Sequence, residues 1–142
     1  MIYTALTKKA MLLAYTAHKD QKDKGGMPYI FHPFFVAEHM DTETETAAAL
    51  LHDVCEDTPI TADDLKNMGF PTEVVSVVDI LSRKENEDYT EYIKRVKQNP
   101  TAAKIKLWDL RHNSMISRIE NPTEKDFERL KKYADAQNIL NN

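Results

Sequence analysis

Apolar residues recur at helical spacing along most of this chain, and no segment alternates convincingly with the period of two that a half-buried strand shows. The first stripe comprises Ile2, Leu6, Ala10, Leu13 and Ala17. Six prolines, at positions 28, 33, 59, 71, 100 and 122, punctuate the segments that carry such stripes. The pattern predicts an all-α fold, a non-repetitive bundle of several helices. The length of 142 residues fits a single domain over residues 1–142.

Capping signals and breakers set the boundaries of the predicted helices. Thr42, Thr61 and Thr123 are each followed three residues later by an acid, which is the pattern of a capping box. The segment 74–81 is rich in β-branched residues, but its apolar positions follow helical spacing after a proline, which favours a helix. The predicted helices span residues 2–19, 34–40, 42–55, 61–69, 74–81, 89–96 and 101–119, with a last helix after Thr123 and a loop over 22–27.

The composition excludes several classes of protein. With only three glycines, the chain cannot assemble a glycine-rich dinucleotide fingerprint or a phosphate-binding P-loop. Its 19 Lys and Arg against 23 Asp and Glu give a formal charge of −4, which argues against a nucleic-acid partner. The longest apolar run, Ala47 to Leu51, falls far short of the roughly 20 residues that span a bilayer, so we expect no membrane partner.

The single cysteine and the first residues bear on the compartment. Cys55 has no partner for an intrachain disulfide, which suits a reducing compartment. The first ten residues lack a basic region followed by an apolar stretch, so we expect no signal peptide. Together these features favour a cytoplasmic protein.

One carboxylate interrupts an apolar stripe. In the segment 101–119 the stripe contains Ile105, Asp109 and Ile116, so Asp109 lies where a buried residue belongs. A buried carboxylate is costly unless it is paired or bound to a cation. Two interpretations follow: Asp109 hydrogen-bonds a neighbouring helix or an arginine, or it is a metal ligand.

A second cluster of polar residues ends the predicted helix 42–55. His52 and Asp53 follow five apolar residues, and Glu56 and Asp57 lie four positions further on, so both pairs project from the same helix end. Three carboxylates this close repel one another, and a bound cation relieves that repulsion. The alternative is a frayed acidic helix end. A further histidine, His32, lies in an aromatic segment beside Pro33, where it is either a core residue or a third source of ligands.

The chemistry of these residues indicates which ions they suit. His32, His52, Asp53 and Asp109 offer two imidazoles and two carboxylates. This mixture suits a six-coordinate Mn²⁺, Fe²⁺ or Mg²⁺ with waters completing the shell, whereas Zn²⁺ prefers four ligands rich in nitrogen or sulfur. A water on such a cation is acidic enough to supply hydroxide near neutral pH.

The order of these residues resembles that of the HD-domain phosphohydrolases, and more narrowly the hydrolase domain of the RelA/SpoT family, including its small stand-alone form. The resemblance covers roughly residues 5 to 117. It rests on Ala17-His18, Gln21, Gly26, Pro28-Tyr29-Ile30, His32-Pro33, Ala48-Ala49-Leu50-Leu51-His52-Asp53-Val54, Glu56-Asp57-Thr58, Lys106-Leu107, Asp109 and His112-Asn113. As a group these motifs are specific, although each dipeptide alone is weak.

The resemblance implies an all-helical enzyme that removes pyrophosphate from the 3′ position of guanosine tetra- and pentaphosphate, so the expected partner is a small nucleotide substrate. It implies that His32, His52, Asp53 and Asp109 hold Mn²⁺. Glu56 and Asp57 match the residues that position or deprotonate the attacking water. Lys24 matches a phosphate contact, and Asn113 matches a ribose or phosphate contact.

Two departures from the family pattern concern substrate binding. Asp23 stands where the family usually has an arginine that helps to hold the guanine nucleotide, so binding of a polyanion is expected to weaken. In the last motif the arginine is displaced by one position to Arg111, and one position turns a helical residue by about 100°, away from the site. The expected metal site is thus kept while the substrate-binding loop is altered.

Several alternatives remain open from the residues. The chain is a phosphatase or nucleotidase acting on another small phosphoester, or it is a non-catalytic helical module that binds a nucleotide or a metal. His18 and His112 either orient metal ligands or pack between helices. The sequence does not indicate an oligomeric state.

Overall fold

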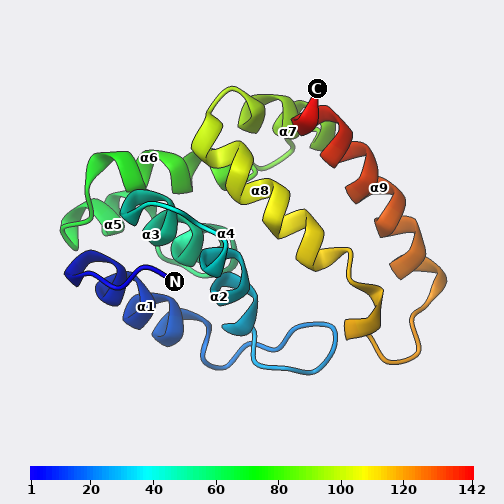
Figure 1. Cartoon of the computed structure of the whole chain (residues 1–142), viewed down its shortest axis with the longest axis horizontal. Coiled ribbons are helices and arrows are strands. Elements are labelled where there is room, and N and C mark those ends of the chain that lie inside the picture. The colour runs from blue at the N-terminus through cyan, green and yellow to red at the C-terminus, as the bar shows by residue number, and fades with distance from the viewer.

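The computed structural model describes residues 1–142 and confirms the predicted all-α class (Figure 1). The helices are α1 (Ala5–His18), α2 (Phe31–Glu38), α3 (Glu43–Leu51), α4 (Val54–Asp57), α5 (Ala62–Asn67), α6 (Thr72–Leu81), α7 (Tyr89–Lys97), α8 (Pro100–Asn113), the 3₁₀ turn η1 (Ile116–Arg118) and α9 (Glu124–Asn141). No helix combines the length and the apolar character needed to cross a bilayer.

The centre of the core is α3. Its residues from Thr46 to Leu51 are fully buried, and the helix packs against α1, α2 and α6. The side chain of Thr42 caps its first turn by accepting a hydrogen bond from the Glu45 amide at 3.1 Å. Small alanines at positions 47–49 allow neighbouring helices to approach closely on all sides, so the end of α3 lies deep inside the molecule.

The helix α8 joins the two halves of the bundle. It packs against α2 and α6 on one side and against α7 and α9 on the other, and Figure 1 shows it running through the middle of the molecule. Asn99 caps it, and Pro100 occupies its first turn, where the missing amide proton costs nothing. This arrangement brings the last turns of α8 beside the end of α3 and the start of α2.

Two of the predicted helices are interrupted. The predicted helix 42–55 divides into α3 and α4, because His52 and Asp53 form a turn in which the Asp53 backbone departs from helical values. The predicted helix 101–119 ends at Asn113, and a separate 3₁₀ turn follows. There the guanidinium of Arg118 donates to the carbonyl of His112 at 2.8 Å, which satisfies one of the free carbonyls at the end of α8.

The burial of α3 leads to a test of the core. We expect Leu50→Ala to lower the free energy of unfolding by about 2–5 kcal/mol, because the fully buried side chain leaves a cavity among three helices. The matched control is Leu12→Ala on α1, where the leucine is 69% exposed and the change should stay within about 0.5 kcal/mol. Urea titration measures both, and equal losses in the two variants would contradict this description of the core.

Candidate metal centre

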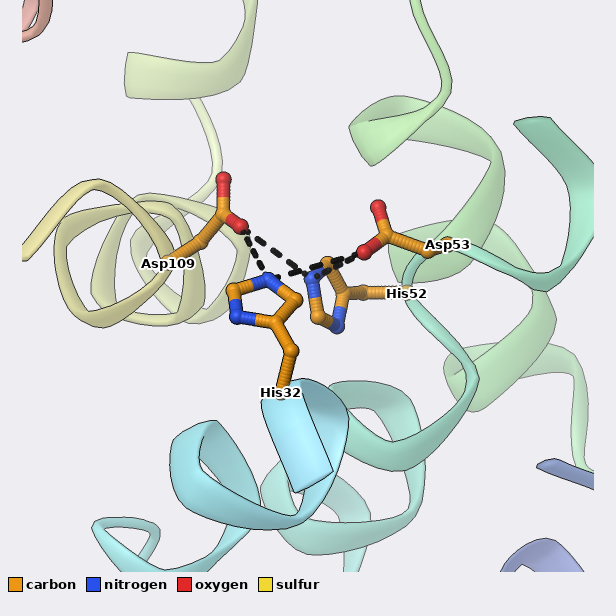
Figure 2. A group of neighbouring side chains, drawn as sticks. All are labelled: His32, His52, Asp53 and Asp109. Atoms are coloured by element: carbon orange, nitrogen blue, oxygen red, sulfur yellow. Dashed lines mark hydrogen bonds and ion pairs between the residues drawn. The ribbon is translucent and has the colours of Figure 1, made fainter. Parts of the chain in front are cut away.

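Four side chains from three parts of the chain converge beside the end of α3 (Figure 2). His32 comes from the first turn of α2, His52 and Asp53 follow α3 directly, and Asp109 projects from α8. One potential ligand atom of each lies within 4.8 Å of the others. The structure therefore brings together all four residues that the sequence nominates as metal ligands.

Asp109 is buried and receives positive charge from its own helix. Its Oδ2 atom accepts a hydrogen bond from Lys106 at 2.7 Å, and its Oδ1 atom lies 2.7 Å from Nε2 of His32. Burial alone would raise the pKa of Asp109, but Lys106 and the imidazoles outweigh it and hold that pKa well below its usual value. One oxygen of Asp109 is thus a structural ion-pair partner, and the other faces the cluster.

The proton on His52 has a fixed place. Its Nδ1 atom lies 2.6 Å from the carbonyl oxygen of Ala49, which can only accept, so Nδ1 carries the proton. In the neutral ring the lone pair on Nε2 then points at oxygens of Asp53 and Asp109, at 3.0 and 3.4 Å. Lone pairs facing one another repel unless a proton or a cation lies between them. Burial lowers the pKa of His52, but the two carboxylates outweigh it and raise that pKa well above its ordinary value.

His112 contacts Nδ1 of His32, the ring nitrogen that does not face Asp109. The two Nδ1 atoms are 2.7 Å apart, so one ring donates and the other accepts. Burial, His32 and Arg118 lower the pKa of His112 to about 4, so its ring is neutral near pH 7. Only the arrangement in which His32 donates leaves the Nε2 lone pair of His32 free to face a cation. Of the two interpretations of His112, its contact with His32 favours the orienting one.

A column of stacked side chains supports His112 from the surface. Phe35 stacks on its ring at 4.0 Å between centroids, and His39 continues the column to Trp108, at 3.7 Å. The guanidinium of Arg111 lies over the Trp108 ring, 4.5 Å from its centroid. Rigid rings thus hold the imidazole that contacts His32.

Asp53 is held by a phenol. The hydroxyl of Tyr29 donates to Oδ2 of Asp53 at 2.6 Å. Burial and the charge of Asp53 raise the pKa of Tyr29 far above its usual value, so the hydroxyl remains a donor. Burial raises the pKa of Asp53 as well, but His52 outweighs it, and the carboxyl stays ionised.

The donor set fits a divalent cation. Two carboxylates and two imidazole nitrogens converge, while the only permanent positive charge in contact with these four residues is that of Lys106. The hydrogen bonds of the two histidines allow both Nε2 lone pairs to face the centre. A cation there would offset the remaining negative charge and separate the facing lone pairs.

Glu56 and Asp57 lie on α4 at the exposed rim of this centre. Oε1 of Glu56 accepts a hydrogen bond from the Arg83 amide at 3.0 Å, which holds one side of that carboxyl. Burial raises the pKa of both residues, and the negative charge of Asp53 raises both further. Both carboxyls are therefore better proton acceptors than ordinary surface acids.

A cavity of about 330 Å³ opens beside the cluster. Lys24 and Asn113, the two residues nominated for substrate binding, line it, and the Asn113 amide also donates to Oδ1 of Asp109 at 3.2 Å. Arg118 and Arg129 line the same cavity, and neither was predicted from the sequence. No periodicity marks them, because Arg118 lies in a turn that was predicted as helix and Arg129 lies on an otherwise charged helix.

Comparison with known proteins identifies relatives of this chain. A model of the HD domain family matches residues 10–122. The bifunctional (p)ppGpp synthase/hydrolase SpoT of Escherichia coli K12 is 38% identical over 120 residues, which cover 75% of this chain and 17% of that protein. A guanosine-3′,5′-bis(diphosphate) 3′-pyrophosphohydrolase of Aquifex aeolicus is 34% identical over 115 residues, which cover 72% of this chain and 16% of that protein. The chain thus spans about one sixth of the length of these relatives.

A solved structure shares the fold. It belongs to a metazoan ortholog of SpoT that hydrolyzes ppGpp and plays a role in starvation responses. The TM-score is 0.79 at 22% identity, over 99% of this chain and 88% of that chain. The helical arrangement described above is therefore found in a protein of similar length.

The first prediction for this centre concerns metal binding. We expect Mn²⁺ at about 100 times its dissociation constant to stabilise the wild-type protein by about 2.7 kcal/mol. That corresponds to a Tm increase of roughly 5–10 °C for a domain of this size. Asp109→Asn should lose this increase, because it removes one of two ligand charges. Thermal unfolding with Mn²⁺ and with a chelator measures the difference within each variant. Asp79→Asn, at the exposed Asp79–Lys84 ion pair, is the control, and a Tm increase retained by Asp109→Asn would contradict the assignment.

The second prediction concerns His112. We expect His112→Phe to preserve the stacking on Phe35 but to weaken Mn²⁺ binding by about 10–100-fold, because His32 loses the acceptor that fixes its proton. Metal titration by calorimetry gives the affinity. The control is His39→Phe, which keeps a ring in the same column but contacts none of the four donors. Equal affinities for His112→Phe and wild type would rule out the orienting role.

Proposed function

This chain belongs to the HD-domain family, and on that basis we propose that it is a divalent-metal-dependent phosphohydrolase that cleaves guanosine 3′,5′-bis(diphosphate) and releases pyrophosphate. The observation that carries the proposal is the convergence of His32, His52, Asp53 and Asp109 beside a cavity whose lining includes two lysines and two arginines. The names of the relatives from Escherichia coli and Aquifex aeolicus support the choice of substrate.

We propose Mn²⁺ as the ion, held by these four residues, with Mg²⁺, Fe²⁺ and Zn²⁺ as alternatives. Mixed nitrogen and oxygen ligands favour Mn²⁺ over Mg²⁺, which prefers oxygen. A bound divalent cation would polarise a phosphoryl oxygen and lower the pKa of water. Tyr29 supports this role by holding Asp53, and Lys106 supports it by holding Asp109 from the side away from the cluster.

The proposed proton acceptors are Glu56 and Asp57. The Arg83 amide fixes Oε1 of Glu56, which leaves Oε2 free to accept a proton from the attacking water. Asp57 lies one residue further along α4, and its raised pKa brings it closer to the range that favours general-base catalysis. Two carboxyls at one rim can therefore orient a water and remove its proton.

The proposed substrate contacts are Lys24 and Asn113. The ammonium of Lys24 takes part in no ion pair, so it is available to a phosphate group. Burial, followed by the charge of Arg129, lowers the pKa of Lys24, and an anion bound beside the ammonium would offset both effects. Asn113 bridges Asp109 and the cavity, where it can hydrogen-bond a ribose hydroxyl or a phosphate oxygen.

We also propose that residues 1–142 form one HD-type domain. A single cluster of buried apolar residues extends from Ala10 on α1 to Leu140 on α9, and α8 contacts helices on both sides of it. Separate expression of a shorter segment would leave part of this surface exposed.

The proposal is tested by removing the proton acceptors. We expect Glu56→Gln and Asp57→Asn each to lower kcat for pyrophosphate release by about 10²–10⁴-fold, because neither amide can accept the proton of the attacking water. Both variants should still bind Mn²⁺, unlike Asp109→Asn. Product chromatography with Mn²⁺ measures release from guanosine 3′,5′-bis(diphosphate).

The control for this experiment is Glu85→Gln, which makes the same chemical change at an exposed position of the loop between α6 and α7. It should match the wild type. No pyrophosphate release by the wild-type protein would reject the proposed substrate. A panel of nucleoside monophosphates and other phosphoesters would then test whether the protein is a phosphatase or nucleotidase with another small substrate.

A further inference from the structure

One wall of the cavity is built by a partly buried ion pair between two segments far apart in sequence. Oδ2 of Asp23, in the loop before α2, lies 3.0 Å from Nη2 of Arg118 on η1. The side chains are 12% and 26% exposed, so both are largely shielded from water. The guanidinium also donates to the His112 carbonyl at 2.8 Å, so Arg118 is held on two sides before any ligand arrives.

Asp23 is held independently of Arg118. Its Oδ1 atom accepts hydrogen bonds from the amides of Gly25 and Met27, at 2.9 and 3.0 Å. Gly25 also packs against η1, because a Cβ atom at this position would overlap the carbonyl oxygen of Arg118. The loop and the turn are therefore in backbone contact, and the carboxylate cannot swing away from the cavity without breaking both amide hydrogen bonds.

The second guanidinium of the cavity is also neutralised. Arg129 pairs with Asp126 at 2.7 Å, and both residues line the same cavity. Of the cavity's cations, only Lys22 and Lys24 have no carboxylate partner. A phosphate that approached Arg118 would meet the negative charge of Asp23, which is fixed in place. An uncharged ribose or base meets no such repulsion, and the cavity also offers it Tyr29, Ile116 and Tyr133 as apolar and aromatic walls.

We propose that Asp23 and Arg118 form a specificity pair that excludes phosphate groups from the part of the cavity that they line and admits an uncharged nucleoside there. This inference rests on the proposed function. The preferred substrate is then a nucleoside 3′-diphosphate whose 5′ position is an unmodified hydroxyl, and guanosine 3′,5′-bis(diphosphate) is accepted with its 5′-diphosphate outside the cavity.

The test compares two substrates that release the same pyrophosphate. For wild type, we expect kcat/KM for guanosine 3′-diphosphate to exceed that for guanosine 3′,5′-bis(diphosphate) by about tenfold, because only the second compound carries a 5′-diphosphate that Asp23 keeps out of the cavity. In Asp23→Asn this ratio should fall by about tenfold, mainly through a lower KM for the bis(diphosphate). The asparagine keeps Oδ1 as an acceptor for the two loop amides, so the substitution removes charge while the loop retains its hydrogen bonds.

Two further variants show whether the effect belongs to the pair. Adding Arg118→Gln to Asp23→Asn should abolish the lower KM for the bis(diphosphate), because that lower KM depends on the guanidinium freed from Asp23. Asp135→Asn, at the exposed Lys131–Asp135 pair on α9, changes the net charge equally and should leave the ratio as in wild type. The ratio within one preparation does not depend on the fraction of folded protein. An unchanged ratio in Asp23→Asn, or an equal change in Asp135→Asn, overturns the inference.

The inference and the proposed function fail in different ways. If the wild-type protein hydrolyses neither compound, the proposed function is wrong. The pair is then tested by calorimetric titration of both compounds in the presence of Mn²⁺. A Kd ratio that shifts toward the bis(diphosphate) in Asp23→Asn, and not in Asp135→Asn, supports the pair without any turnover. A ratio that does not shift, or no binding of either compound, overturns it.

Discussion

Two carboxylates buried where three segments meet impose the main constraint on this structure. Asp53 and Asp109 cannot remain ionised inside the protein without positive charge, and Lys106 supplies only part of it. Lys106 and Asp109 lie on the same face of α8 and pair with each other. Because Asp109 also has to reach Asp53 and the two histidines, α8 must lie beside the end of α3. The position of α8 in the middle of the bundle therefore serves both the core and the centre.

Much of the fold and of the candidate metal centre could be predicted from the sequence, because the patterns that indicate them are local. Helical stripes and threonine caps indicated the class and most helices. The capping box at Thr61 forms as expected, whereas at Thr42 only the N-cap hydrogen bond forms and Glu45 accepts from the Asp41 amide. Asp109 was recognisable because it replaces an apolar residue in a stripe, which is a local anomaly with a physical cost. His32 carried no comparable signal. It became a candidate ligand only through the other donors and the resemblance to a family.

The features that could not be predicted depend on contacts between distant segments. The predicted helix continues through 114–115, but a turn follows Asn113, in which Arg118 donates to the His112 carbonyl from a separate 3₁₀ turn. The division between α3 and α4 likewise follows from the side chains of His52 and Asp53 turning toward α2 and α8. Asp23 looked like the loss of a cation from a binding loop. The fold shows that the same aspartate brings a guanidinium from another segment to that position.

The stacked column that ends on His112 also contains the only tryptophan of the chain. Trp108 lies between His39 and Arg111, and Phe35 connects this stack to the imidazole that touches His32. The tryptophan fluorescence of the folded protein therefore originates at one place, a few rings from the candidate ligands. The molecule thus carries a built-in optical reporter, whose signal comes from the neighbourhood of the centre and needs no attached dye.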